Sequence, residues 1–218
     1  MHKKGLIPYN PYFLFPFLVW VVAGGILLAA CTRQDLFYAI NTHYSPVADT
    51  LVYYLTFMGQ AEVIIPVLLL LFIFRRFRNL WYFFAALLCN IVPFFVEQFL
   101  KAHFHTPRPK LLYYDRLWVH YSPDWPYLLH NGFPSGHSEG AFSLFCFLSL
   151  LLPAKCRGWG LVFFLLALSV CYSRIYLAAH FFEDVYAGSI IGVVFTTVIF
   201  SLMNKYKTFF FFRKNTFM

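Results

Sequence analysis

His180 and Asp184 are four residues apart, so a helix would place their side chains on one face. A carboxylate in that position can hydrogen-bond one imidazole nitrogen and fix which nitrogen carries the proton. The other nitrogen is then free to act as a nucleophile or a base. Arg174 precedes the histidine by six residues, and its planar guanidinium suits phosphate oxygens. Residues 173–184 therefore predict a histidine nucleophile beside a phosphate-binding arginine; the alternative is a structural corner held by an Arg174–Asp184 ion pair.

A second group of polar residues is the run Pro134-Ser135-Gly136-His137. A glycine at the start of a helix allows close backbone approach, and the free N–H groups there attract an anion. Ser135 adds a hydroxyl donor, and His137 could protonate a leaving oxygen as a general acid. The alternative is a plain helix cap, with Ser135 as the capping residue and His137 at the membrane interface.

The third group is Lys101 and Arg108, which are separated by the stretch Ala-His-Phe-His-Thr-Pro. Two cations from a helix end and a proline-stiffened loop could hold one phosphate from two directions. The alternative is a pair of cations that extend from a helix end toward water. His103 and His105 lack a third ligand in the sequence, so no metal is expected there and no cofactor is expected anywhere.

The composition indicates which elements must position these residues. Of 218 residues, 61% are hydrophobic and only 12% are charged, about half the charged share of a soluble domain. This balance excludes a soluble globular enzyme and indicates an integral membrane protein. The net charge of +8 is not gathered on a soluble module, so nucleic acid is not an expected partner. The apolar runs predict an all-α bundle in a single domain, 1–218, with six transmembrane helices at about 12–30, 51–74, 80–99, 136–152, 158–178 and 181–203.

The segments between these runs complete the predicted organisation. A polar loop is expected at 33–45, an interfacial segment at 58–60, an outer loop at about 103–133 and an interfacial tail at 204–218. Five cysteines without CxxC spacing are expected to be small apolar fillers and not disulfides.

Six spans place both termini on one side of the membrane, and that side carries eleven Lys and Arg residues against six on the other. The positive-inside rule then makes the termini cytoplasmic. With this topology, all three polar groups lie at the outer membrane face. Two histidines, three cations and an orienting carboxylate in one place are the requirements for phosphoryl transfer without a metal.

The three groups resemble the signature of the type 2 phosphatidic acid phosphatase family, K-x6-R-P, P-S-G-H and S-R-x5-H-x3-D. The resemblance covers about 51–203 and implies a membrane helical bundle. It implies that His180 attacks phosphorus, that Asp184 orients His180 and that His137 protonates the leaving oxygen. It further implies that the phosphate oxygens are held by Lys101, Arg108, Ser135, Gly136 and Arg174.

Three further features lie outside the signature. Glu97 precedes Lys101 by four residues and could orient it through a helical ion pair. Glu139 could line the pocket or shift a nearby pKa, or it could pair with a cation. The aromatic residues of the outer loop favour either membrane anchoring or substrate recognition; they are Tyr113, Tyr114, Trp118, Tyr121, Trp125 and Tyr127.

These observations lead to one expected function and two alternatives. We expect a metal-independent phosphatase of a membrane lipid phosphate or diphosphate, with its site on the periplasmic face of a bacterial inner membrane. Lipid A is slightly preferred as substrate because the outer loop is basic, followed by undecaprenyl diphosphate and phosphatidylglycerophosphate. The alternatives are a lipid phosphotransferase and a non-catalytic lipid-binding or transport protein. The oligomeric state is not indicated by the sequence.

Overall fold

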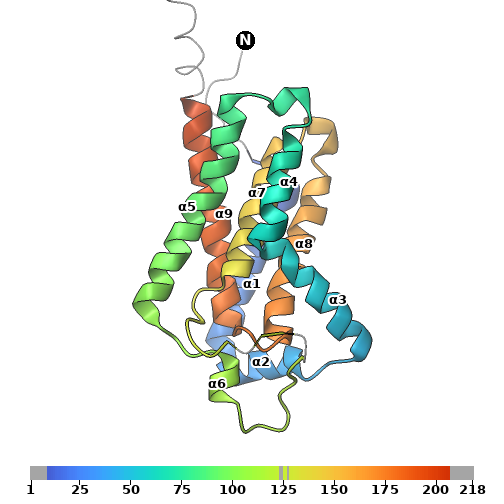
Figure 1. The fold of residues 1–218 in the computed structure, drawn as a ribbon, viewed down its shortest axis with the longest axis vertical. Helices are drawn as coiled ribbons and strands as arrows, with labels where there is room; N and C mark the ends of the chain where they lie inside the picture. The colour runs from blue at the N-terminus through green and yellow to red at the C-terminus, as the bar shows by residue number, and fades with distance from the viewer. Residues whose placement is uncertain (1–8, 123–124, 127, 207–218) are drawn as a thin grey trace, which may run out of the picture.

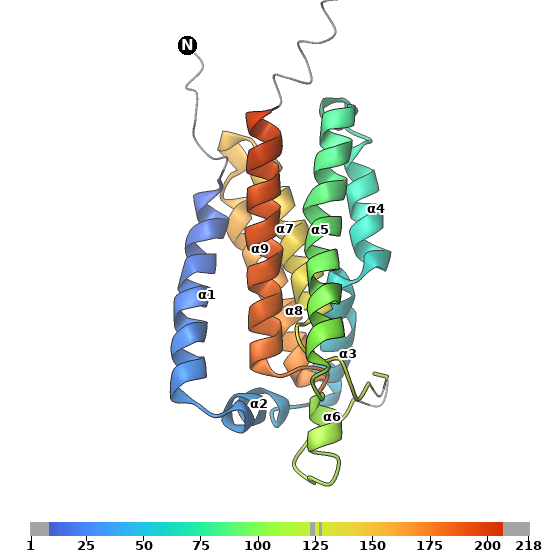
Figure 2. The same cartoon turned by 90° about the vertical axis from the view of Figure 1, so that its left-hand side faces the viewer.

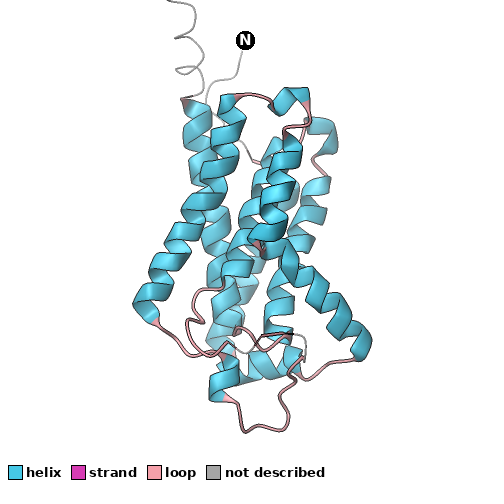
Figure 3. Ribbon diagram, in the orientation of Figure 1, coloured by secondary structure: helices cyan, strands magenta, loops and turns pink. Residues whose placement is uncertain are grey.

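A computed structural model describes residues 9–122, 125–126 and 128–206, and within these ranges the secondary structure is entirely helical (Figures 1 and 3). The α-helices are α1 (Pro11–Ala30), α2 (Arg33–Asn41), α3 (Pro46–Thr56), α4 (Ala61–Leu71), α5 (Leu80–Phe104), α6 (Pro109–Leu112), α7 (Gly136–Leu151), α8 (Trp159–Tyr176) and α9 (Phe182–Lys205). Short 3-10 turns are η1 (Phe57–Gly59), η2 (Arg75–Phe77) and η3 (Ala154–Cys156).

Four segments are long and apolar enough to cross a membrane: α1, Leu80–Leu112 (α5 together with α6), α8 and α9. A fifth crossing is possible if α3 and α4, which are bent by 57° at a short break, form one span. The described residues therefore support an integral membrane protein with four or five such spans. The predicted span 136–152 corresponds to α7, which has 16 residues and is short for a bilayer crossing, so a total of six spans is not confirmed.

The short helix α7 lies at the centre of the bundle, with α5, α8 and α9 around it (Figures 1 and 2). Small residues allow α9 to approach it closely: a Cβ atom on Gly192 would lie 2.6 Å from the carbonyl oxygen of Glu139. Phe142 of α7 is fully buried against Phe13 and Phe17 of α1. This packing fixes the start of α7 relative to α8 and α9.

The two ends of the bundle carry different helix ends. The start of α1 and the end of α9 lie together at one end, and the ends of α5 and α8 lie at the other with α2 and α6 (Figure 2). All three polar groups therefore lie at the end of the bundle that is opposite the start of α1 and the end of α9. Residues 1–8 and 207–218, including Lys3, Lys4 and most of the predicted interfacial tail, are outside the described residues.

Three predicted connections differ from the structure. The polar loop 33–45 contains the helix α2, because Thr32 and Asp35 cap each other and Phe37 is completely buried. The outer loop 103–133 begins only after α5 ends at Phe104, and it contains α6. The predicted interfacial segment 58–60 is the break between α3 and α4, and it packs against α7. All five cysteines are free, as predicted.

Candidate active site

His180 lies in a tight turn between α8 and α9. The backbone N–H groups of Ala179 and His180 both donate to the carbonyl of Arg174, at 3.0 and 3.1 Å. Ala178 takes a left-handed backbone conformation with φ of 50°, which lets the chain reverse within the turn. The turn leaves only 1% of His180 exposed. The histidine is therefore held rigidly inside the protein.

Both ring nitrogens of His180 have partners. Nδ1 lies 3.4 Å from Oδ2 of Asp184, and that oxygen also accepts a hydrogen bond from the N–H of Phe181 at 2.9 Å. Nε2 lies 3.1 Å from Nη1 of Arg108, which can only donate. The proton of a neutral His180 is therefore on Nδ1, and Nε2 presents its lone pair. Burial, reinforced by the positive charge of Arg108, holds the pKa of His180 well below its usual range.

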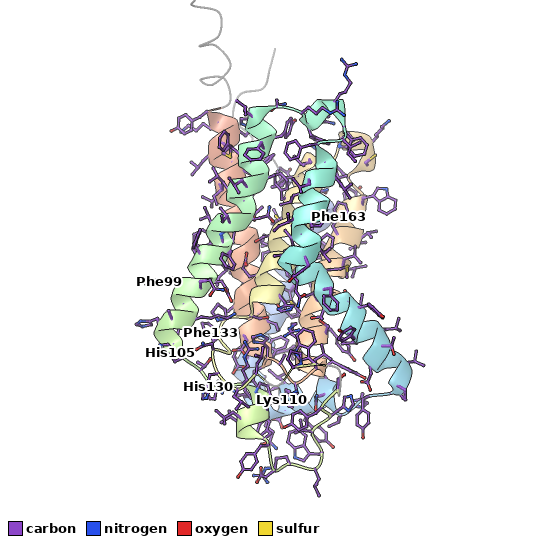
Figure 4. All side chains as sticks on the ribbon, viewed as in Figure 1. Phe99, His105, Lys110, His130, Phe133 and Phe163 are labelled. Carbon is purple, nitrogen blue, oxygen red and sulfur yellow. The ribbon has the colours of Figure 1, made fainter. Side chains whose placement is uncertain are left out.

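Arg108 joins the outer loop to the turn that carries His180, which we name the catalytic turn after the role proposed for it below. Its guanidinium donates to the carbonyl of Ala179 at 3.0 Å and to those of His130 and Asn131 at 2.8 and 3.0 Å. His130 is in the loop that leads to α7, at the same end of the molecule as His105 at the end of α5 (Figure 4). Arg108 is 6% exposed, so its charge is close to His180 and shielded from water. It is more than a surface cation, because it also fixes the fold of this loop.

Lys101 is held by Glu97, as the four-residue spacing predicted. The two side chains form an ion pair, and Gln98 donates a further hydrogen bond to Oε2 of Glu97 at 2.8 Å. Glu97 is completely buried. A Cβ atom on Gly136 would lie 2.8 Å from Oε1 of Glu97 and 3.4 Å from Nζ of Lys101. Lys101 therefore reaches the start of α7, and a side chain at position 136 would have to displace the Glu97 carboxylate.

The start of α7 is fixed to α9 next to the catalytic turn. The N–H of Ser135 donates to the carbonyl of Asp184 at 2.9 Å, so the polar group at 134–137 and the polar group at 173–184 share a backbone hydrogen bond. Ser135 caps α7, with its hydroxyl accepting from the N–H of Ser138 at 3.5 Å. Capping and anion binding both use this helix start, so the two interpretations of Ser135 are compatible. Ser135 is completely buried.

Arg174 is completely buried, and its partners come from other elements. Nη1 donates to Oγ1 of Thr56 at 2.7 Å, and the guanidinium carbon lies 4.4 Å from the centre of the Trp125 ring. Nε of Arg174 is buried and has no hydrogen-bond partner among the described residues. The Arg174–Asp184 ion pair of the alternative interpretation is replaced by the contact with Thr56. An unpaired donor on a buried cation fits a site that receives an anion.

His137 has two neighbours that the sequence motifs did not predict. Its Nε2 lies 2.8 Å from the side-chain amide nitrogen of Gln60, and its ring meets that of Trp125 edge to face at 5.8 Å. Gln60 gave no signal in the sequence beyond its place at an expected interruption. Trp125 was predicted as one of the aromatic residues of the outer loop, and it is buried beside Arg174 and His137.

The other aromatic residues of this loop divide into two groups. Tyr113 and Trp118 pack against Phe37 of α2, and Tyr114 is 80% exposed. Tyr127 is outside the described residues. The loop is thus partly a structural cover over the site, and among its aromatic residues that the structure describes only Tyr114 has the exposure expected of a membrane anchor.

Glu139 does not pair with a cation. Its carboxylate accepts a hydrogen bond from Ser143 at 2.7 Å, and the residue is 2% exposed. His103 and His105 are exposed, with Nδ1 of His105 3.3 Å from Oδ1 of Asn131. Within the described part of the chain, no three His, Cys, Asp or Glu residues are grouped as metal ligands.

Comparisons with known proteins agree with this arrangement. The model of the PAP2 superfamily matches residues 78–207. The crystal structure of LpxE from Aquifex aeolicus is 30% identical and covers 76% of this chain and 93% of that chain, with a TM-score of 0.65. A transmembrane PAP2 type phosphatidylglycerolphosphate phosphatase from Bacillus subtilis is 21% identical and covers 90% and 97%, with a TM-score of 0.65, which shows a common fold. A search of curated proteins finds no match.

The helical bundle and its buried cluster of histidines and cations define a membrane phosphatase, an enzyme that acts on membrane lipids. The chain belongs to the PAP2 superfamily, because the family model matches more than half of it and the LpxE structure extends the similarity to three quarters. The family resemblance predicted from the three sequence motifs is thereby confirmed.

Proposed function

We propose that this enzyme hydrolyses a phosphate monoester or diphosphate on a membrane lipid through a phosphohistidine at His180. The observation that carries the proposal is the pairing of His180, with Nδ1 toward Asp184 and Nε2 toward Arg108. A buried neutral imidazole with a fixed tautomer is a prepared nucleophile. An incoming phosphate oxygen would take the place of Nε2 as the partner of Arg108.

The residues around His180 support a two-step reaction. Nε2 attacks phosphorus, the bond to the leaving oxygen breaks, and His137 gives that oxygen a proton. Water then attacks the phosphohistidine, His137 takes up a proton from this water, and phosphate leaves. The developing negative charge is stabilised by cations and by N–H groups at the start of α7, supplied by Lys101, Arg108, Arg174, Ser135 and Gly136. Because these groups supply the positive charge, we propose that no metal is required.

The proposed substrate class follows from the position of the site in the bundle. The catalytic turn joins two spans, so a phosphate at the membrane surface can reach it while its acyl chains stay in the bilayer. Lipid A remains the first substrate to test, because a large anionic head group suits the basic outer loop at this end of the bundle. However, Arg33 pairs with Glu183, and Lys110 is buried. Fewer free cations therefore face solvent than the sequence suggests.

We propose that the site is on the periplasmic face of a bacterial inner membrane, with cytoplasmic termini. The support is the excess of Lys and Arg at the end that carries Arg75, Arg76 and Arg78. A single catalytic domain then comprises the whole chain.

The test is phosphate release by purified protein from lipid A, undecaprenyl diphosphate and phosphatidylglycerophosphate. We expect release from at least one lipid, unchanged by a chelator, and a loss of about 10⁴-fold or more in His180→Ala. Enzyme quenched under alkaline denaturing conditions, in which a phosphorus–nitrogen bond is stable, should carry phosphate on histidine in the wild type and not in the variant. Transfer to an acceptor lipid without free phosphate would replace the hydrolase by a phosphotransferase. Full activity of His180→Ala would contradict the proposed nucleophile.

A further inference from the structure

The break between α3 and α4 is packed directly on the first turn of α7. Thr56 ends α3, η1 follows, and Gln60 precedes α4. A Cβ atom on Gly59 would lie 2.8 Å from the carbonyl carbon of His137, and one on Gly140 would lie 2.9 Å from the carbonyl oxygen of Gly59. Two glycines thus allow the backbone of the break to touch the backbone that carries His137.

Two side chains of the break reach the candidate active site. Oγ1 of Thr56 accepts from Nη1 of Arg174 at 2.7 Å, and the amide of Gln60 lies 2.8 Å from Nε2 of His137. Thr56 is completely buried. Both residues lie outside the three motifs and outside residues 78–207, which the family model matches. The contacts therefore join a part of the chain without motif residues to a candidate phosphate ligand and a candidate proton donor.

We propose that Thr56 and Gln60 are positioning residues, Thr56 for the phosphate-binding guanidinium of Arg174 and Gln60 for the proton transfer by His137. This inference rests on the proposed function, because it assigns to both residues an effect on that reaction. If these roles are correct, the break between α3 and α4 contributes to the reaction in addition to packing in the bundle.

The side-chain amide of Gln60 suits a group that must gain and lose a proton. Its nitrogen lies next to Nε2 of His137 in this arrangement, and after the amide rotates its oxygen can accept from Nε2–H, the hydrogen that the ring keeps in both the neutral and the charged form while a proton is exchanged at Nδ1. Pairing at Nε2 leaves Nδ1 to exchange the proton with the leaving oxygen or with water. The charged groups around His137 are the cations Arg174, Lys101 and Arg108, and a neutral amide pairs with the ring without cancelling their attraction for phosphate.

Thr56 acts on the orientation of a cation. One face of the Arg174 guanidinium is covered by Trp125, and its Nη1 is held by Thr56. With these two contacts the plane of the guanidinium is fixed, and its buried Nε remains as a donor for a phosphate oxygen. Loss of the hydroxyl should weaken phosphate binding more than it slows the chemical step.

The test compares four variants with two controls, using phosphate release from the best lipid substrate in detergent between about pH 5 and pH 9. The variants are Gln60→Leu, Gln60→Glu, Thr56→Val and Thr56→Ser. The controls are Thr50→Val on the exposed side of α3 and Gln34→Leu on the exposed side of α2. Thermal unfolding of each protein identifies variants that lose activity through misfolding, and the near-isosteric Gln60→Glu and Thr56→Ser variants keep both positions testable.

We expect Gln60→Leu to lower kcat by about tenfold to a hundredfold with KM changed less than about twofold. Gln60→Glu should move the alkaline limb of the rate profile to higher pH, because a carboxylate beside His137 favours the imidazolium. Thr56→Val should raise KM by about tenfold, and Thr56→Ser should restore it to within about twofold of the wild type. Both controls should match the wild type.

Two kinds of failure can be told apart. If folded Gln60→Leu and Thr56→Val have the kinetics of the controls, or if Gln60→Glu leaves the pH profile in place, the positioning roles are wrong and the phosphatase is unaffected. If the wild type releases no phosphate from any lipid, or if His180→Ala is fully active, the proposed function fails and the inference falls with it.

Discussion

His180 is buried between an anion and several cations, and this environment determines the pH at which it can act as the proposed nucleophile. Asp184 holds the proton on Nδ1, whereas burial and the nearby arginines oppose a second proton on the ring. A protonated imidazole has no lone pair with which to attack phosphorus. Because its pKa is lowered, His180 stays neutral and reactive at pH values where a free histidine would be protonated.

The first prediction concerns this pH dependence. A free imidazole is half protonated near about pH 6.5, so a pKa below that value moves the loss of nucleophile to more acidic pH. We expect kcat/KM of the wild type to keep most of its value as the pH falls through about 6.5. The measurement is a pH profile of kcat/KM, corrected for titration of the substrate phosphate, whose second pKa is about 6. A corrected acid limb centred near 6.5 would contradict the lowered pKa.

The ion pair of Glu97 and Lys101 gives a second prediction. Glu97 is completely buried, so the charge of Lys101 has one fixed anionic partner within the helix. We expect Glu97→Gln to lower kcat/KM by about tenfold, because Lys101 loses its orientation at the start of α7. Steady-state kinetics measure the loss, and Lys101→Met combined with Glu97→Gln completes a double-mutant cycle. If the two losses simply add, Glu97 does not act through Lys101.

At the level of helices, the site depends on close backbone contacts made by glycine. The break at Gly59 and the first turn of α7 touch, and α9 approaches α7 at Gly188 and Gly192. These contacts place Gln60, Ser135 and His137 relative to the catalytic turn. A methyl group at such a contact must push one helix away from another.

The third prediction tests this dependence with Gly59→Ala. The added methyl group would overlap the carbonyl group of His137, so we expect a loss of about 1–3 kcal/mol in stability and a marked loss of activity. Gly158→Ala is the matched control, because a Cβ atom there meets nothing within 4 Å. Thermal unfolding in detergent and phosphate release are the measurements. If Gly59→Ala and Gly158→Ala have equal stability and equal activity, the break can move away from α7 without loss of either, and the prediction is wrong.

For the whole molecule, the main consequence of the fold is that the two terminal helix ends and the candidate site are at opposite ends of the bundle. Leu117 is fully exposed in the outer loop, and Lys155 is exposed in η3 at the other end. The proposed orientation therefore places these two positions on opposite sides of the membrane.

The fourth prediction tests that orientation by labelling. In a background in which the two partly exposed cysteines are removed (Cys31→Ser and Cys156→Ser), an impermeant thiol reagent added to spheroplasts should label Leu117→Cys and leave Lys155→Cys unlabelled. Permeabilised membranes should be labelled at both positions, which shows that both thiols are accessible. The opposite pattern, with Lys155→Cys labelled first, would place the site on the cytoplasmic side.

The local predictions that proved correct depend on residues that are close in sequence. The Glu97–Lys101 ion pair follows from four-residue spacing on one helix, and the capping role of Ser135 follows from its place before Gly136. The sequence predicts a polar loop where α2 forms, because the helix depends on a local capping box between Thr32 and Asp35 and on the burial of Phe37. Apolar content predicted a helix at 136–152, and α7 occupies Gly136–Leu151, but its 16 residues are too few to confirm a sixth crossing.

The sequence by itself determined the membrane class, the family and the residue types of the site, because hydrophobic runs and fixed motif spacings are local properties. Only the tertiary structure decided what each group touches. It paired Arg174 with Thr56 instead of Asp184, buried Trp125 beside that arginine and brought Gln60 to His137. These partners are 118, 49 and 77 positions apart in the chain, and only the packing of the break and the outer loop against α7 and α8 makes them neighbours.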